Sequence, residues 1–370
     1  MRTQAAVLWE PRSDWRIEEI ELDPPRETEV LVRMVAAGIC HSEEHHVTGD
    51  VPFVAPMIGG HEGAGVVEAV GPGVTSVEPG DHVVFSSIPS CGRCPSCARG
   101  RHNLCDLGRY LAEGRQLLDH TARHHIGDVD LAITCLLGTF ARHTVVNEAS
   151  VIRVDGDVPL ELACLVGCGV PTGWGSAVYA GGVEPGDDVA VVGIGGLGAS
   201  AVQGARFAGA RRVFAIEPVA WKREKALDLG ATHAAADVEE AFDLVREVTW
   251  GRMCSQVILT MSVGRGDLMA SIMALAAKRG RVVVTNIHPA AEREVHLSLL
   301  DLASFEKQIV GCIFGSVNAR FDIPRLVDYH REGRLDLEGL VTRTYALEEI
   351  NEGYADLREG RNLRGVVRFG

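Results

Sequence analysis

A glycine-rich segment between two apolar stretches is the feature that most constrains the fold of this chain. Residues 193–198 read G-I-G-G-L-G, directly after the wholly apolar run 189–192 and at the start of a stretch with helical spacing. In a strand–turn–helix unit, these glycines allow a tight turn, close approach of backbone N–H groups to a pyrophosphate, and close packing of helix on strand. The opposing interpretation is a glycine-rich turn that binds nothing. The context favours a dinucleotide-binding loop made of Gly193, Gly195, Gly196, Leu197 and Gly198.

An acidic residue follows the next apolar run at the spacing that a dinucleotide site requires. Glu217 directly follows the run 212–216 and lies 19 residues after Gly198. A carboxylate there would accept hydrogen bonds from the adenosine ribose and repel a 2′-phosphate, so it favours NAD over NADP. Basic side chains close in sequence work against that preference: Arg211, Arg212, Lys222 and Arg223.

The pattern of apolar residues divides the chain into two parts. From about residue 185, short apolar runs alternate with helical spacings, which predicts an α/β unit with a parallel sheet covered on both faces. The first ~165 residues contain short apolar runs separated by glycine, proline and acidic residues, which favours a β-rich, barrel-like unit. The last ~55 residues could return to the first unit or cap the second, because periodicity does not decide between these.

Four cysteines lie close together in the pattern C-x2-C-x2-C-x7-C, at Cys91, Cys94, Cys97 and Cys105. Thiolates at this spacing predict a closed tetrahedral zinc site, which has no position for a substrate and is therefore structural. Iron–sulfur ligation is the rival interpretation. Its sequence run continues as C-x3-C-P, whereas Asp106 follows the fourth cysteine here.

Composition narrows the partners and the compartment. The 370 residues include 36 basic and 50 acidic side chains, a net charge of −14, which disfavours binding to nucleic acid or anionic lipid. No apolar run approaches the ~20 residues of a membrane span, and the N-terminus lacks the apolar region of a signal peptide. Ten cysteines without such a signal, four of them at metal-like spacing, favour the reducing cytoplasm over a disulfide-bonded exterior.

Three further metal donors stand apart in the segments C-H-S, G-H-E-G and G-C-G, as Cys40, His61 and Cys168. Two thiolates and one imidazole would bind zinc and leave a fourth position for water or substrate, which is the arrangement of a catalytic site. The spacing does not decide this, because a lone cysteine or histidine is more often a packing residue. The dinucleotide loop in the same chain strengthens the catalytic interpretation.

Taken together, these segments resemble the zinc-dependent medium-chain alcohol dehydrogenases over essentially all 370 residues. The segments that carry the resemblance are AAGICHSEEHHVTGD, GGHEGAGVVEAVGPGV, CGRCPSCARGRHNLC, GCGVPTGWGSAV and GIGGLG. Others, such as EPVAWKREKALDLGATH, are most similar to the actinobacterial NDMA-dependent branch, whose members are described as holding NAD tightly and re-oxidising it in place with an external acceptor. The resemblance implies interconversion of an alcohol and its aldehyde or ketone, two zinc ions per chain, NAD, and a homodimer or homotetramer.

The resemblance also implies a domain division and residue roles. A GroES-like, β-rich catalytic domain would span 1–169 and 314–370 with a structural zinc lobe at about 90–107, and a Rossmann, doubly wound parallel-sheet domain would span 170–313. The catalytic zinc would be bound by Cys40, His61 and Cys168, and the structural zinc by the four lobe cysteines. Among catalytic residues, Ser42 would lie beside the alcohol, Glu62 behind the metal, and His45 at the outer end of a proton relay through the nicotinamide ribose. The resemblance also implies a set of cofactor-binding residues: His41 and Arg364 at the pyrophosphate, Thr172 beside the nicotinamide ring, and Lys222 together with Glu217 and the dinucleotide loop.

Two residues depart from the family pattern. Glu43 replaces the usual aspartate after the relay hydroxyl, and its extra methylene could shift the hydrogen bond that orients the zinc-bound histidine. Glu217 replaces the commoner aspartate on the ribose, which is a milder change.

Two other functions stay open at this point. One is oxidation of a formaldehyde–thiol adduct, in which Arg109 would hold the thiol's carboxylate, although a solvated loop arginine is the simpler interpretation. The other is a non-catalytic zinc and nucleotide-binding protein, which the full set of zinc ligands argues against.

We expect His120, His124 and His125 to be solvent-exposed, because their surroundings in sequence are polar.

Overall fold

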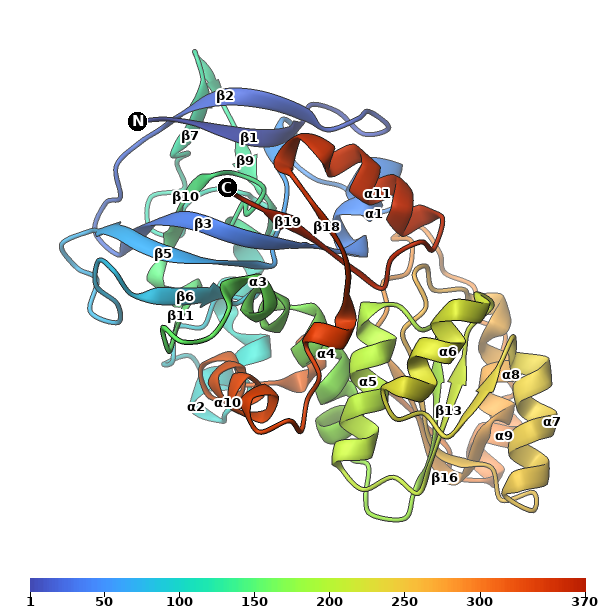
Figure 1. Ribbon diagram of the computed structural model, residues 1–370. Coiled ribbons are helices and arrows are strands. Elements are labelled where there is room, and N and C mark those ends of the chain that lie inside the picture. Colours follow the sequence, from blue (N-terminus) through green and yellow to red (C-terminus); the bar gives the residue numbers. More distant parts are fainter. The chain divides into compact units, whose positions relative to one another are not determined.

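A computed structural model describes all 370 residues, and the chain divides into two compact units (Figure 1). The first unit contains Met1–Cys168, Asn318–Gly333 and Val341–Gly370, and the second contains Gly169–Val317 and Arg334–Leu340. The short return of Arg334–Leu340 to the second unit has a local cause. The side-chain amide of Gln203 donates to the carbonyl of Asp336 over 3.1 Å and accepts from its N–H over 2.7 Å.

The first unit is built on two mainly antiparallel sheets. One has the strand order β8-β7-β2-β1-β4-β9, and the other has the order β11-β6-β5-β3-β19-β18 with β10 also paired to β3. The strands of the first sheet are β1 (Arg2–Leu8), β2 (Arg16–Leu22), β4 (Met57–Ile58), β7 (His124–Ile126), β8 (Val129–Asp130) and β9 (Ala132–Ile133). Those of the second are β3 (Glu29–Ile39), β5 (Gly63–Val70), β6 (His82–Phe85), β10 (His143–Asn147), β11 (Val151–Val154), β18 (Val341–Tyr345) and β19 (Arg364–Arg368). The helices are α1 (His41–Thr48), α2 (Pro95–Ala98), α3 (Leu160–Ala163), α10 (Ala319–Arg331) and α11 (Ile350–Arg358).

Strand β3 organises the second of these sheets. It pairs antiparallel with β5, β10 and β19, so Gly365 of the last strand lies opposite Ile39. The C-terminal segment therefore returns to the first unit, which periodicity alone did not decide. Because β3 ends at Ile39, the following residue Cys40 is held at a fixed point at the end of the central strand.

An aromatic cluster forms part of the core beside this strand. Trp15, Phe140 and Tyr354 come from distant parts of the sequence, and their ring centroids are 5.9–6.2 Å apart. Edge-to-face and offset contacts at this distance stabilise by about 0.5–1.5 kcal/mol beyond the area that they bury. Tyr354 of α11 thus fixes the C-terminal helix against the N-terminal strands.

One expectation about the polar excursion is wrong. His124 is 1% exposed on strand β7, where its Nε2 lies 3.2 Å from the hydroxyl of Thr144. Its backbone pairs with Leu22 of β2, and its ring is buried against Thr144 of β10 in the other sheet, although the sequence around it is polar. His125 is partly exposed and His120 is exposed.

The second unit is a parallel sheet between two layers of helices. Its strand order is β14-β13-β12-β15-β16-β17, and every adjacent pair is parallel. The strands are β12 (Asp188–Val192), β13 (Arg212–Ile216), β14 (His233–Ala235), β15 (Cys254–Leu259), β16 (Ala276–Val284) and β17 (Gln308–Gly311). The helices are α4 (Gly169–Gly175), which continues as a π-helical turn, α5 (Gly196–Phe207), α6 (Ala220–Asp228), α7 (Val238–Val248), α8 (Met269–Ala274) and α9 (Leu299–Ser304). This is the Rossmann order, which reverses direction at β12 and creates a ligand crevice at the carboxyl ends of the strands.

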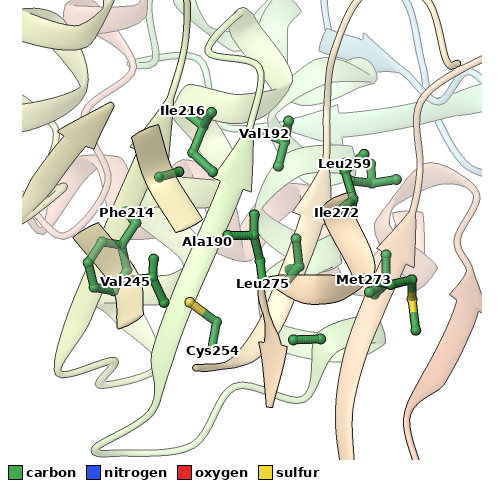
Figure 2. Packing of buried hydrophobic residues seen from close by; sticks show 14 of the residues in the cluster. Ala190, Val192, Phe214, Ile216, Val245, Cys254, Leu259, Ile272, Met273 and Leu275 are labelled. Carbon is green, nitrogen blue, oxygen red and sulfur yellow. The ribbon is translucent and has the colours of Figure 1, made fainter. Parts of the chain in front are cut away.

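Figure 2 shows why these strands form a buried sheet. Side chains of β12 and β13, such as Val192 and Phe214, point toward Val245 of α7 and Ile272 of α8. All four are at most 5% exposed. Burying an aliphatic or aromatic side chain of this size contributes about 1.5–3 kcal/mol, so the sheet and its helices stabilise each other.

No single helix is both long enough and apolar enough to cross a membrane, and only the bent pair Leu160–Gly167 and Gly169–Gly181 would meet those criteria jointly.

Candidate active site

The four lobe cysteines are close enough to share one metal ion. The sulfur atoms of Cys91, Cys94, Cys97 and Cys105 all lie within 4.8 Å of one another, and those of Cys94 and Cys105 are 4.0 Å apart. Four sulfurs placed about 2.3 Å from a tetrahedral zinc would be about 3.8 Å apart. The donor set therefore fits a closed zinc site.

Backbone N–H groups in this lobe point at the sulfurs. Cys91 N donates to the sulfur of Cys105 and Cys94 N to that of Cys91, each over 3.3 Å. The backbone N–H of Asp106, followed by that of Cys97, lowers the pKa of Cys94 to about 6. Burial raises the pKa of Cys105 to about 12, so metal binding must displace protons from this cluster.

The three scattered donors also meet at one point in the first unit. The donor atoms of Cys40, His61 and Cys168 lie within 4.8 Å of one another. Cys40 follows strand β3, His61 precedes strand β5, and Cys168 follows the 3-10 helix Cys164–Gly167. Cys40 and His61 are 4% and 2% exposed, whereas Cys168 is partly exposed. Three donors leave the fourth position of a tetrahedral zinc open.

A buried carboxylate orients the histidine of this trio. His61 Nδ1 lies 2.5 Å from Oε1 of Glu43, which is 0% exposed. Burial disfavours charge on His61, but the Glu43 carboxylate outweighs it and holds the pKa of His61 well above its ordinary value. A hydrogen bond from Cys168 lowers the pKa of Cys40 well below that of a free thiol. The same hydrogen bond raises the pKa of Cys168, so the pocket holds protons on His61 and Cys168 that a metal would displace.

Behind the trio, Glu62 and Arg364 form a buried ion pair. Gly38 makes room for it, because a Cβ atom at residue 38 would lie 1.9 Å from Oε2 of Glu62. The Nε atom of Arg364 has no hydrogen-bond partner. The structure thus brings Glu62 and Arg364 together, although the resemblance assigned them to the metal and to the pyrophosphate respectively.

Helix α1 carries His41, Ser42 and His45, for which the resemblance implied roles in the proton relay and in cofactor binding. Ser42 Oγ lies 3.5 Å from the sulfur of Cys40. The ring centroids of His41 and His45 are 5.3 Å apart. His45 is 1% exposed, and its Nδ1 lies 3.1 Å from the carboxylate of Asp50, which the sequence gave no reason to single out.

The glycine-rich loop in the second unit has the expected strand–turn–helix geometry. Gly193 follows β12 with φ +94°, and its carbonyl accepts from the hydroxyl of Thr260 over 2.7 Å. A Cβ atom at residue 198 would lie 1.9 Å from that same carbonyl oxygen, whereas one at residue 195 would have no atom within 4 Å. The third glycine therefore serves packing, and the second leaves the backbone open to a ligand. This space at the first turn of α5 fits a pyrophosphate.

The acidic residue at the end of β13 is held by the loop itself. Glu217 accepts from Ile194 N over 2.7 Å and from Val219 N over 3.1 Å. Arg223 donates to the carbonyls of Glu217 and Pro218, so its charge is partly committed to the backbone. Lys222 is largely buried, and burial lowers its pKa. Thr172 is buried on α4.

Polar groups beyond β16 were missed by the sequence analysis. The hydroxyl of Thr285, both side-chain polar atoms of Asn286 and Nε2 of His288 are buried without a hydrogen-bond partner. They follow the carboxyl end of β16, which is the edge of a Rossmann sheet where a dinucleotide binds. Such orphaned groups fit a polar cofactor that would satisfy them. A polar cluster directly after an apolar strand was the sequence signal that would have revealed them.

Comparisons with known proteins show the family to which the chain belongs. Residues 26–156 match the alcohol dehydrogenase GroES-like domain, and residues 196–329 match the zinc-binding dehydrogenase domain. The chain is 51% identical over 367 residues to an NDMA-dependent alcohol dehydrogenase from Amycolatopsis methanolica, with 99% of each chain covered. The chain belongs to the zinc-dependent medium-chain alcohol dehydrogenase family. It is therefore an oxidoreductase with a GroES-like domain and a Rossmann domain, and zinc and NAD are the cofactors of its chemistry.

Other relatives are similar to this chain over its full length. Alcohol dehydrogenase B from Mycobacterium tuberculosis is 49% identical over 370 residues, covering 100% of this chain and 99% of the relative. Among solved structures, an alcohol dehydrogenase zinc-binding domain protein from Burkholderia ambifaria superimposes with a TM-score of 0.93 at 32% identity, over 100% of this chain and 99% of that one. Benzyl alcohol dehydrogenase from Acinetobacter calcoaceticus has a TM-score of 0.91 at 28% identity, with both chains fully covered.

Proposed function

We propose that this enzyme interconverts an alcohol and its aldehyde or ketone at the Cys40–His61–Cys168 trio, by hydride transfer to NAD. The observation that carries the proposal is that the donor atoms of Cys40, His61 and Cys168 lie within 4.8 Å of one another, with Glu43 beside the ring of His61, a set that would leave one position of a tetrahedral zinc open. The four lobe cysteines in the same unit would hold a second, structural zinc.

The chain's own residues would have distinct tasks in this reaction. When bound, zinc supplies Lewis-acid polarisation of the substrate oxygen, and NAD supplies the hydride acceptor. Cys40, His61 and Cys168 would hold the metal, and Glu43 fixes the ring of His61 through Nδ1. Ser42, next to Cys40, would accept the hydroxyl proton of the alcohol at Oγ while it releases its own hydroxyl proton through the nicotinamide ribose toward His45. His45 would accept the relayed proton at Nε2 and later release a proton to water.

The activity test uses zinc-replete, NAD-loaded enzyme with a series of primary and secondary alcohols and with NDMA as acceptor. We expect turnover with at least one alcohol, and loss of it when Cys168 is replaced by serine. Absence of turnover with every alcohol and acceptor would instead support the non-catalytic alternative.

We infer further that NAD stays bound between turnovers and is re-oxidised in place by an external acceptor. Similarity to the NDMA-dependent relative supports this, as do the orphaned polar groups after β16, which a permanently bound cofactor would satisfy. The test is to dialyse the purified protein extensively, denature it, and quantify released nucleotide. About one NAD or NADH per chain is expected. An empty protein whose turnover depends on added NAD would show an exchangeable cofactor.

No contact favours the thiol-dependent formaldehyde alternative. The guanidinium of Arg109 lies over the ring of Tyr110 at 4.6 Å and donates to its hydroxyl over 2.5 Å. This arginine is therefore already engaged by its neighbour. Formaldehyde oxidation that requires a thiol such as glutathione would revive the alternative.

We also propose a homo-oligomer that works in the cytoplasm. Strand β17 is the edge of the Rossmann sheet, and Ile309 on it and Ile313 beyond it are 40% and 51% exposed. An exposed apolar edge strand is suited to pairing with a second copy of the chain. Replacing Ile309 by lysine should shift the sedimentation of the protein toward monomer. An unchanged sedimentation coefficient would exclude this edge as the interface.

The proposed cytoplasmic location is supported by the ten cysteines, none of which forms a disulfide, as is typical of a reducing compartment.

A further inference from the structure

The C-terminal turn of helix α1 brings an acidic residue back over His45. The helix ends at Gly49, whose φ of +84° is the left-handed conformation that glycine adopts readily. The chain then reverses so that Val51 N donates to the carbonyl of His45 over 3.1 Å. Asp50, five residues after His45, therefore lies beside its ring.

Two hydrogen bonds hold Asp50 in that position. Its Oδ2 lies 3.1 Å from Nδ1 of His45 and accepts from the hydroxyl of Thr48 over 2.8 Å. The Asp50 side chain is 30% exposed, whereas that of His45 is 1% exposed. The ring of His45 is therefore buried, while the carboxylate that contacts it is partly exposed to solvent.

The chemistry of the pair determines the tautomer of the histidine. An ionised carboxylate can only accept hydrogen bonds, so Nδ1 of His45 must carry the N–H. The hydroxyl of Thr48, followed by the ring of His45, lowers the pKa of Asp50, which therefore stays ionised at neutral pH. Nε2 of His45 is then the nitrogen that is able to accept a proton.

We propose that Asp50 is a positioning residue for alcohol oxidation, which holds His45 with Nδ1–H directed at its carboxylate and leaves Nε2 as the proton acceptor. The inference rests on the proposed function. The proton that leaves the alcohol hydroxyl is bound at Nε2, the Asp50 carboxylate keeps its charge and stabilises the resulting imidazolium, and the proton passes to water later. No further oxidant or reductant is needed, because the hydride goes to NAD in the proposed reaction.

The test compares Asp50→Asn and Asp50→Ala with Asp130→Ala as a matched control. Asp130 also accepts from a histidine five residues earlier, His125 Nδ1 over 2.9 Å, but it lies on the β7–β8 hairpin outside the metal pocket. The readouts are the tautomer of His45 from nitrogen-15 NMR of histidine-labelled protein, assigned with His45→Gln, and the rate of alcohol oxidation with and without formate. Zinc content and thermal stability are measured for each variant.

In the wild type and in Asp130→Ala, we expect the Nδ1–H tautomer and an unchanged rate. In Asp50→Asn, whose amide can donate to Nδ1, we expect a mixture of tautomers. A misoriented ring should lower the rate about 10- to 100-fold, as loss of an orienting partner does at metal-bound histidines. Formate should restore part of the activity of Asp50→Ala, because it can replace the carboxylate at this partly exposed position.

An unchanged tautomer or a wild-type rate in both Asp50 variants would overturn the inference. If either variant loses zinc or unfolds, the other decides, and formate rescue separates a missing carboxylate from general damage. If His45→Gln also keeps the wild-type rate, the proposed role of His45 itself fails. If only His45→Gln is impaired, the function stands and the role of Asp50 does not.

Discussion

Glu43 and His61 form a buried pair in which the carboxylate lies 2.5 Å from Nδ1 of the ring. Glu43 is fully buried, and the hydroxyl of Tyr354 lies 3.5 Å from its other oxygen. The extra methylene of Glu43, relative to the aspartate of the family pattern, therefore does not prevent the hydrogen bond to His61. Because Nδ1 is occupied, Nε2 of His61 is the nitrogen that can bind a metal with Cys40 and Cys168.

The first prediction follows from this pair. Glu43→Gln removes the charge that favours the oriented, basic imidazole, and we expect zinc affinity at the trio to fall about 10- to 100-fold. Dialysis against a graded series of chelator concentrations, with zinc measured by mass spectrometry, checks this. Glu43→Asp is the matched variant and should lose less, because it keeps the charge. Equal zinc retention by wild type and Glu43→Gln would contradict the prediction.

The second prediction concerns the closed site. Cys97→Ser removes one of four sulfurs, so we expect the protein to hold about one zinc per chain instead of about two, and to unfold at a lower temperature. NAD binding should persist, because the dinucleotide loop belongs to the other unit. Loss of both zinc ions, or of neither, would show that the lobe is not an independent zinc site.

The third prediction separates two glycines of the same motif. Gly198→Ala places a methyl group against the carbonyl of Gly193, and we expect it to destabilise the Rossmann unit by about 1–3 kcal/mol. Gly195→Ala meets no protein atom, so stability should change by less than about 0.5 kcal/mol while NAD affinity falls. Urea denaturation and nucleotide titration measure the two effects. A Gly195→Ala variant that keeps full NAD affinity would contradict the assignment of this loop.

The fourth prediction concerns pH and the buried His124. Burial, aided by His125 and Arg123, lowers the pKa of His124 to about 3. The unfolded chain binds a proton near pH 6.5 and the folded chain does not, so the free energy of unfolding decreases as pH falls below about 6.5. Between about pH 7 and about pH 5 this one group costs about 2 kcal/mol.

The control is His124→Asn, which keeps a polar partner for Thr144 but does not titrate. Urea denaturation at both pH values should show that the pH dependence of the variant is smaller by that amount. Equal pH dependence in the two proteins would mean that His124 becomes protonated without unfolding.

The parts of the site that were predictable from sequence are those whose residues are close in sequence. Four cysteines in one lobe and three glycines in one turn each form their site through local geometry. The trio required the fold, because Cys40, His61 and Cys168 meet only through the pairing of β3 with β5 and the position of the helix before Cys168.

Other features escaped for similar physical reasons. The contact between Asp50 and His45 depends on the left-handed turn at Gly49, which a spacing rule does not reveal. His124 was expected to be exposed because its neighbours are polar, yet its ring is buried against Thr144 of β10, which lies in the other sheet. The return of the C-terminal strand to β3 is a tertiary pairing that apolar periodicity cannot specify.

The most direct test of the central claim is a single-turnover experiment on zinc-replete, NAD-loaded enzyme. The protein is mixed with an alcohol in the absence of any acceptor, and the absorbance of reduced nicotinamide is followed. The account predicts a rise that corresponds to one NADH per loaded site in the wild type, and no rise in Cys168→Ser. A wild-type enzyme that forms no NADH with any alcohol, or a Cys168→Ser variant that forms as much, would contradict it.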